Sequence, residues 1–235
     1  MKMIGLKQKK NLFLINSRMT KIGKRSNMRE KTAQEELWEG NFGDSYIERN
    51  NSQELLASNV HFFAKILSKI HPISTCIEFG ANIGLNLKAI NILFPKIEME
   101  AVEINESAVK KLAGIVPKKN IFHKSIIDFT PVKKHDLVLV KGVLIHISPS
   151  DLDQVYQNIY NASSNYVLMC EYYNRTPVSL TYRGLEGMLF KRDFCSEFLT
   201  KFSDFQLVDY GFAYHRDPNC SQDDITWFLL KRVNK

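Results

Sequence analysis

The sequence lacks any long apolar run without charges, and no stretch approaches the roughly 18 residues that a membrane-spanning helix requires. An integral membrane protein with such helices is therefore excluded. Cysteine is also scarce, and the four residues Cys76, Cys170, Cys195 and Cys220 show no CxxC spacing. This pattern argues against a zinc site or a disulfide framework, and it predicts mostly buried thiols in a reducing cytoplasm.

Acidic residues are absent from the first 29 positions, and the chain of 235 residues carries a net charge of +7. Residues 1–31 account for +9 and residues 32–235 for −2. The only apolar cluster of this tail, residues 12–15, is shorter than the about 7–15 apolar residues of a secretory signal. We interpret residues 1–31 as a disordered, solvated extension. The alternatives are an arm that touches RNA or an acidic membrane surface, and a translation start at Met28.

Internal repeats and linkers rich in Pro, Gly or Ser are likewise absent after residue 31, which predicts one domain over residues 32–235. Apolar residues at helical spacing predict a helix over residues 52–70, with Ser52 as its N-cap. Short apolar runs then alternate with helical segments, a pattern typical of a parallel sheet covered on both faces. The predicted strands are 75–79, 97–102, 121–122, 136–140 and 166–170, and the predicted helices are 85–93, 106–113 and 151–161.

The last third of the chain departs from this alternation. A helix is predicted over residues 191–199, and the apolar runs 205–212 and 225–231 follow without a comparable helix between them. Two strands joined by a loop pair most easily in an antiparallel manner. A parallel α/β sheet that ends in an antiparallel strand pair is the architecture of the common methyltransferase fold.

A glycine loop, Glu78-Phe79-Gly80-Ala81-Asn82-Ile83-Gly84, joins the first predicted strand to helix 85–93. Glycine permits a tight turn and a close ligand, and ligands of open α/β sheets bind beyond the carboxyl ends of the strands. The spacing is neither that of a dinucleotide site nor that of a P-loop. A glutamate before the first glycine would repel phosphates, so the loop suits a cationic or neutral group. Glu103, at the end of the next strand, is placed to accept hydrogen bonds from ribose hydroxyls.

These residues resemble the class I S-adenosylmethionine (SAM)-dependent methyltransferases, whose first motif is E/D-x-G-x-x-x-G. The resemblance covers residues 74–171 and implies a Rossmann-like α/β fold, with a mostly parallel seven-stranded sheet, and SAM as the cofactor. Ser125 stands where the family often has an aspartate, while residues 136–146 match the fourth motif well. The implied cofactor-binding residues are Glu78, Gly80, Asn82 and Gly84 around methionine and ribose, Glu103 on the ribose diol, Ile104 against adenine, and also Ser125, Ile126 and Lys141.

Further segments resemble a narrower family, the pseudaminic acid biosynthesis-associated methylases. They are residues 32–52, 141–147, 171–174, 182–184, 190–194, 209–218 and 223–228. This resemblance implies a small, polar, anionic acceptor, a nonulosonic sugar or an intermediate of its pathway. Guanidinium groups bind carboxylates and phosphates through paired hydrogen bonds, and tyrosines supply flat walls. The expected acceptor-binding residues are Glu171, Tyr172, Tyr173, Asn174, Tyr182, Arg183, Lys191 and Arg216. The alternative for the arginines is that they form surface ion pairs.

The segment around Gly40 and Gly43 is expected to form a lid over SAM, with Trp38 and Tyr46 near the cofactor and Arg49 on its carboxylate. The alternative is that Trp38 and Tyr46 are ordinary packing anchors.

An oxygen acceptor needs a base near neutral pH, and histidine is the natural candidate. His215, beside Arg216 and Asp217, is the preferred candidate, and His146 is the second, with the alternative that it only supports the SAM loop. No metal site is predicted, a small molecule rather than nucleic acid is the expected partner, and the chain is expected to be a monomer or homodimer. The competing functions are an RNA or protein methyltransferase recruited by the basic tail, and a SAM-binding protein without catalysis.

Overall fold

A computed structural model describes residues 29–70 and 72–233. The chain divides into two units, Met1–Lys31 and Thr32–Lys235. The disorder predicted for residues 1–31 falls mainly on residues 1–28, which lie outside the described residues. Within the part that is described, no helix is long and apolar enough to cross a membrane. The fold below is that of the second unit.

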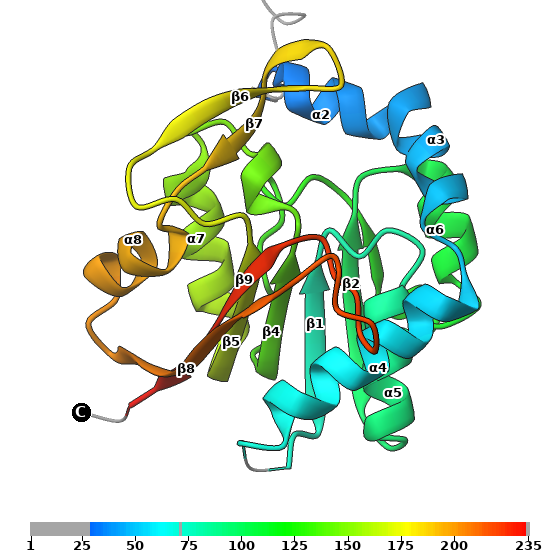
Figure 1. Ribbon diagram of the computed structural model, residues 1–235, viewed down its shortest axis with the longest axis vertical. Coiled ribbons are helices and arrows are strands. Elements are labelled where there is room, and N and C mark those ends of the chain that lie inside the picture. The colour runs from blue at the N-terminus through cyan, green and yellow to red at the C-terminus, as the bar shows by residue number, and fades with distance from the viewer. Residues whose placement is uncertain (1–28, 71, 234–235) are drawn as a thin grey trace, which may run out of the picture. The chain divides into compact units, whose positions relative to one another are not determined.

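A seven-stranded sheet forms the centre of this unit, in the order β3-β2-β1-β4-β5-β9-β8 (Figure 1). The first five strands run parallel, and β9 pairs antiparallel with both β5 and β8. The predicted fold class is therefore confirmed. The strands are β1 (Thr75–Phe79), β2 (Glu98–Glu103), β3 (Ile121–His123), β4 (His135–Lys141), β5 (Ser163–Glu171), β8 (Phe205–Ala213) and β9 (Ile225–Arg232).

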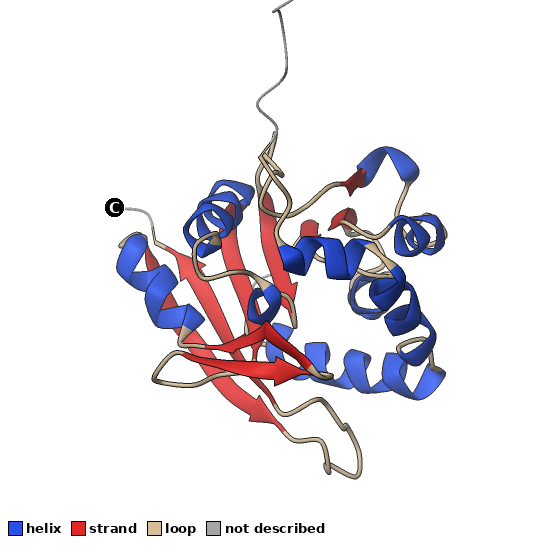
Figure 2. Cartoon of the chain, turned by 90° about the horizontal axis from the view of Figure 1, so that it is seen from above, coloured by secondary structure: helices blue, strands red, loops and turns tan. Residues whose placement is uncertain are grey.

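Helices cover both faces of the sheet (Figure 2). Ser52 begins its helix as predicted, and Asn105 begins α6 in the same way, because the side-chain oxygen of each accepts a hydrogen bond from a backbone N–H of the first turn. The helices are α2 (Ala33–Glu39), α3 (Asn41–Arg49), α4 (Gln53–Leu67), α5 (Leu85–Leu93), α6 (Glu106–Leu112), α7 (Leu152–Ala162) and α8 (Phe194–Lys201), with the short 3-10 turns η1 (Lys118–Asn120) and η2 (Leu144–His146).

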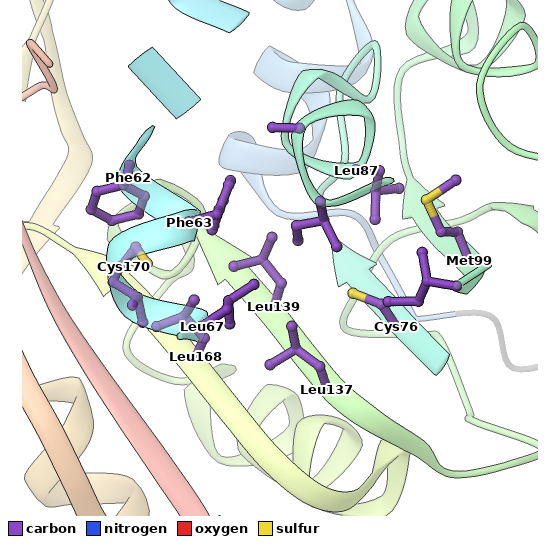
Figure 3. Packing of buried hydrophobic residues seen from close by; sticks show 14 of the residues in the cluster. Phe62, Phe63, Leu67, Cys76, Leu87, Met99, Leu137, Leu139, Leu168 and Cys170 are labelled. Carbon is purple, nitrogen blue, oxygen red and sulfur yellow. The ribbon is translucent and has the colours of Figure 1, made fainter. Parts of the chain in front are cut away.

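The core consists of two apolar layers, one on each face of the sheet. Successive side chains of a strand point to opposite faces, so Leu137 and Leu139 face one layer and Val138 and Val140 the other. Figure 3 shows the first layer, in which side chains of α4 and α5 pack on β1, β4 and β5. Helices α7 and α8 supply the second layer. This double cover explains why the central strands are apolar throughout.

The prediction of a helix over residues 191–199 was wrong at its start. Residues up to Lys191 belong to β7 (Leu185–Lys191), which pairs antiparallel with β6 (Val178–Tyr182) in a separate two-stranded sheet. Helix α8 begins only after Asp193, whose carboxylate accepts a hydrogen bond from Ser196 N at 2.9 Å. This N-cap fixes the first residue of the helix, and Lys191 forms no such cap.

Candidate active site

A cavity of about 700 Å³ lies at the carboxyl ends of β1, β2 and β4. In Figure 1, α2 and the β6–β7 hairpin lie above this end of the sheet. Its size falls within the range of about 300–1,000 Å³ that is common for small-molecule sites. The wall consists of six segments: residues within 34–59 of the N-terminal helices, 80–86 after β1, 103–105 after β2, 124–126 after β3, 141–147 after β4, and the loop 217–223.

The glycine loop forms one wall of the cavity by turning sharply between β1 and α5. Gly80 N and Ala81 N both donate to Val102 O, at 2.8 and 3.1 Å, so the loop is held against β2. Gly80 has a φ of 75°, and a Cβ at this position would lie 2.6 Å from a methyl of Val143. Only glycine fits both restraints. Gly80 and Asn82 line the cavity, whereas Gly84 lies behind it as the N-cap of α5.

Glu103 joins two loops of the cavity wall at the end of β2. Its Oε2 accepts a hydrogen bond from Asn82 N at 2.7 Å, and its Oε1 accepts one from Asn105 N at 2.8 Å. The side chain is 7% exposed, and burial raises the pKa of its carboxyl above the usual value. The carboxylate therefore organises the glycine loop and the start of α6 around the cavity.

Glu78 is fully buried behind the glycine loop. Asn86 Nδ2 donates to its Oε1 at 2.7 Å, while Oε2 has no hydrogen-bond partner within the described residues. Burial raises the pKa of this carboxyl to about 8, although the hydrogen bond from Asn86 and the charge of Lys141 act in the opposite direction. An unpaired buried carboxyl oxygen beside a cavity favours a partner that brings a positive charge.

A chain of side-chain amides extends from Glu78 across α5 and α4 to the loop 217–223. Gln222 Nε2 donates to Asn59 Oδ1 at 3.1 Å, and Asn59 Nδ2 donates to Asn86 Oδ1 at 3.0 Å. Asn59, Asn86 and Gln222 all line the cavity, and none was predicted. One signal was available, since Asn59 stands among the apolar residues of helix α4. A polar residue in such a stripe needs buried partners.

The segment predicted to form a lid folds into the helices α2 and α3. The Trp38 ring packs edge-on against Phe42 and Tyr46, with both centroid distances 5.2 Å, and lies 4.7 Å from the ring of His146. Trp38 and Tyr46 line the cavity. Arg49 does not line it, because its guanidinium lies over the rings of Phe42 and Tyr46 on the exposed side of α3.

His146 is a cavity residue with a fixed orientation. Its Nδ1 lies 2.7 Å from Met188 O of β7, so Nδ1 carries the proton and donates to that carbonyl. The side chain is 6% exposed, and burial lowers the pKa of the imidazole to about 4. The ring is therefore neutral at pH 7. Within the described residues no hydrogen bond is made by Nε2, which keeps its lone pair available.

His215 lies outside the set of residues that line the cavity, although the loop it begins contributes to the wall. Its Nδ1 is 2.9 Å from both carboxylate oxygens of Asp224, and its side chain is half exposed. Its backbone N–H also donates to Asp224 Oδ1 at 3.0 Å. This pair closes the loop on itself and places Asp217 and Asp223 at the cavity.

The structure gathers some of the predicted residues and separates others. The predicted residues that line the cavity are Trp38, Tyr46, Gly80, Asn82, Glu103, Ile104, Ser125, Ile126, Lys141 and His146. The predicted acceptor-binding residues lie elsewhere. Glu171 is buried at the end of β5, Tyr172 packs between both core layers beneath Lys191, and Tyr182 contacts His146 and Phe42. Tyr173, Arg183 and Arg216 are exposed, and Asn174 is half-buried.

Comparisons with known proteins identify the fold. No protein-family model matches the sequence, and a comparison with curated proteins finds no match. A SAM-dependent methyltransferase from Leishmania major is similar in structure, with a TM-score of 0.62, 13% identity, and coverage of 86% of this chain and 87% of that chain. The 1,6-didemethyltoxoflavin-N1-methyltransferase of Burkholderia thailandensis, solved with 1,6-didemethyltoxoflavin and S-adenosylhomocysteine, has a TM-score of 0.64, 13% identity, and coverage of 88% and 93%.

A third similar structure is the magnesium protoporphyrin IX methyltransferase of Synechocystis with bound SAM. Its TM-score is 0.58 and its identity 11%, with coverage of 88% of this chain and 100% of that chain. Identities this low establish the architecture and not the substrate. The chain therefore has the Rossmann-like fold of the class I SAM-dependent methyltransferases.

Proposed function

We propose that this protein is a SAM-dependent methyltransferase that acts on a small polar acceptor. The observation that carries the proposal is the cavity at the carboxyl ends of β1 and β2, where the glycine loop and Glu103 meet. This is the place at which an open α/β sheet binds a nucleoside ligand. Neighbouring structures of the same fold contain SAM or S-adenosylhomocysteine at 11–13% identity.

The residues present fit SAM in both charge and hydrogen bonding. SAM carries a sulfonium and an ammonium group, and the cavity wall has more acidic than basic side chains. The acids are Glu35, Glu54, Glu103, Asp217 and Asp223, against Lys124 and Lys141. The unpaired Oε2 of Glu78 lies behind the same wall. Glu103 would hold the ribose hydroxyls, while Ile104 and Ile126 would pack against the adenine.

Bound SAM supplies an electrophilic methyl group, and the protein has to position an acceptor and remove its proton. His146 is the candidate for the second task, because its protonated Nδ1 donates to Met188 O and leaves Nε2 as the unprotonated nitrogen, although burial weakens the imidazole as a base. Nε2 of His146 would accept the proton that an acceptor hydroxyl loses when it takes up the methyl group. Trp38 and Tyr46 would exclude water from this exchange.

For the acceptor we propose a nonulosonic sugar or a related pathway intermediate, on the strength of the sequence resemblance. The wall formed by α4 and the loop 217–223 supports the sugar part of this proposal, because side-chain amides and carboxylates can bind several hydroxyl groups. Asn219 and Asp223 of this loop line the cavity, and Asn50 at the end of α3 also lines it. The arginines expected to bind an anionic group are not in this wall, so recognition of hydroxyl groups is the better supported part.

We expect the full-length protein to bind S-adenosylhomocysteine in a calorimeter and to methylate at least one member of a panel of nonulosonic acids and their nucleotide sugars. Labelled SAM and mass spectrometry would locate the methyl group. Failure to bind S-adenosylhomocysteine would contradict the proposal. Binding without product from the panel or from a cell extract would favour a non-catalytic protein. Salt-dependent RNA binding that is lost on deletion of residues 1–27 would favour a nucleic-acid substrate.

We expect His146→Gln to lower turnover on the accepted sugar by at least ~100-fold, because a positioned base contributes about that much or more. Glutamine fills a similar volume without supplying a base. His215→Gln is the matched control, with little change expected, since His215 is bound to Asp224 outside the cavity wall. The reverse result, with His215→Gln inactive and His146→Gln active, would assign the base to His215.

A further inference from the structure

Glu171 makes an unusual set of contacts for a residue at the end of a parallel strand. It is 3% exposed, and its carboxylate accepts hydrogen bonds from three successive backbone N–H groups. Val143 N and Leu144 N donate to Oε1 at 3.0 and 3.1 Å, and Ile145 N donates to Oε2 at 3.4 Å. The side chain is not part of the cavity wall. The carboxylate of Glu171 therefore accepts its hydrogen bonds from the protein backbone and not from a ligand in the cavity.

The local backbone explains how three N–H groups converge on one carboxylate. Lys141 is the last residue of β4, and Gly142 N still donates to Cys170 O, at 2.9 Å, which places the turn beside the end of β5. Gly142 has a φ of 68°, a conformation that side-chain-bearing residues rarely adopt, and the chain reverses there. The next three N–H groups then point back at Glu171. The carboxylate satisfies donors that the start of a helical turn leaves unpaired.

The short turn that Glu171 caps is η2, which ends at His146. His146 N donates to Val143 O at 2.9 Å, so the position of His146 along the backbone follows from the residues bound by Glu171. The imidazole is fixed independently by Met188 O and by the rings of Trp38 and Tyr182. The backbone of the turn that carries His146 is therefore held by one side chain, Glu171 at the end of β5.

We propose that Glu171 is a positioning residue, which holds the turn Val143–His146 so that Nε2 of His146 faces the cavity. This inference rests on the proposed function, in which His146 is the base. It differs from the role expected from the sequence, where Glu171 contacts the acceptor. The carboxylate acts through the backbone of residues 143–145 and touches neither substrate nor cofactor.

Glu171→Gln in the full-length protein tests this role by nuclear magnetic resonance. Glutamine keeps the size but presents an NH₂ group to at least one of the three donors. We expect the amides of Val143, Leu144 and Ile145 to exchange at least ~10-fold faster with solvent. We also expect the pKa of His146, followed through its ring carbon, to rise by about one unit or more toward the usual value near 6.5. The cause is that a loosened turn exposes the ring to water.

Glu100→Gln is the matched control, because Glu100 is also a buried glutamate, at 7% exposure, but lies on β2 and pairs with Lys133 before β4 and with His135 at its start. It should leave the titration of His146 unchanged. Should Glu171→Gln fail to fold, Glu171→Asp keeps the charge and withdraws the carboxylate by one methylene, and the same two shifts are expected with smaller size. The proposal would be overturned if a folded variant showed the wild-type amide exchange at residues 143–145 and the wild-type pKa of His146. It would also be overturned if the variant bound a panel sugar more weakly while both of these properties stayed unchanged. A wild-type protein that binds no S-adenosylhomocysteine contradicts the proposed function, while the titration of His146 still decides the role of Glu171.

Discussion

Glu103→Gln is expected to weaken binding of S-adenosylhomocysteine by about 100-fold, because hydrogen bonds to a charged group contribute about 1.5–3 kcal/mol each. The carboxylate accepts from Asn82 N and Asn105 N with different oxygens. In the variant one of these N–H groups would face the NH₂ group of glutamine, so two donors would point at each other. The glycine loop and the start of α6 would then separate, in addition to any loss of a ribose contact. Isothermal titration calorimetry measures the change directly.

Glu106→Gln supplies the control for this prediction. Glu106 lies only three residues away but is exposed, and it pairs with Lys110 on the same helix. Exposed pairs of this kind contribute little to stability or to binding. An affinity of the Glu103 variant within about threefold of the wild type, where about 100-fold is expected from charged hydrogen bonds, would show that the site does not depend on this carboxylate.

The parts of the site that could be predicted from the sequence are those set by local backbone requirements. Gly80 has to adopt a left-handed φ next to Val143, and Glu103 has to end a strand beside it. Each of these requirements restricts the residue type at one position, and the two positions have a recognisable spacing in the sequence. The apolar strands β1, β4 and β5 were equally predictable, because burial on both faces removes polar residues from them.

The remaining parts depend on contacts between residues far apart in the sequence. Gln222 and Asn59 are 163 positions apart, and no local sequence pattern around either residue predicts that the two share a hydrogen bond. The same holds for Glu171, whose type and position fitted acceptor binding equally well until its three N–H partners were known. Helices α2 and α3 were not predicted because Gly40 and Gly43 weaken the helical pattern. Local signals therefore predicted the cavity-lining residues of the glycine loop and of Glu103 better than those that depend on distant contacts.

Glu78→Gln is expected to make the protein progressively more stable than the wild type as the pH rises from about 5 to 8. The pKa of Glu78 is about 8 in the folded protein and about 4.5 in an unfolded chain. Between these values the folded state retains a proton that the unfolded state has released. The contribution of protonated Glu78 is therefore complete below about pH 4.5 and is lost as the pH rises through 8, by at most about 1.4 kcal/mol per pH unit.

The comparison between variant and wild type isolates this one group. Glu171, with a pKa of about 7, gives a slope of the same sign, and His146, with a pKa of about 4, gives the opposite sign below about pH 6.5, but both are present in the two proteins and cancel. Glutamine can still accept from Asn86 Nδ2, so the fold is retained. Chemical denaturation at pH 5, 6, 7 and 8 measures the difference in the free energy of unfolding. A difference that does not change with pH would show that Glu78 is ionised throughout.

Saturating SAM extends the same experiment to the proposed function. A cation bound near Oε2 of Glu78 favours the ionised carboxylate and lowers its pKa toward the unfolded value. SAM should therefore flatten the fall in stability between pH 6.5 and 8 in the wild type, and its own affinity should increase with pH over that range, because binding releases a proton. Neither effect should occur in Glu78→Gln, which has no proton to release. A wild-type affinity for SAM that is independent of pH would place the positive charge of the ligand away from Glu78.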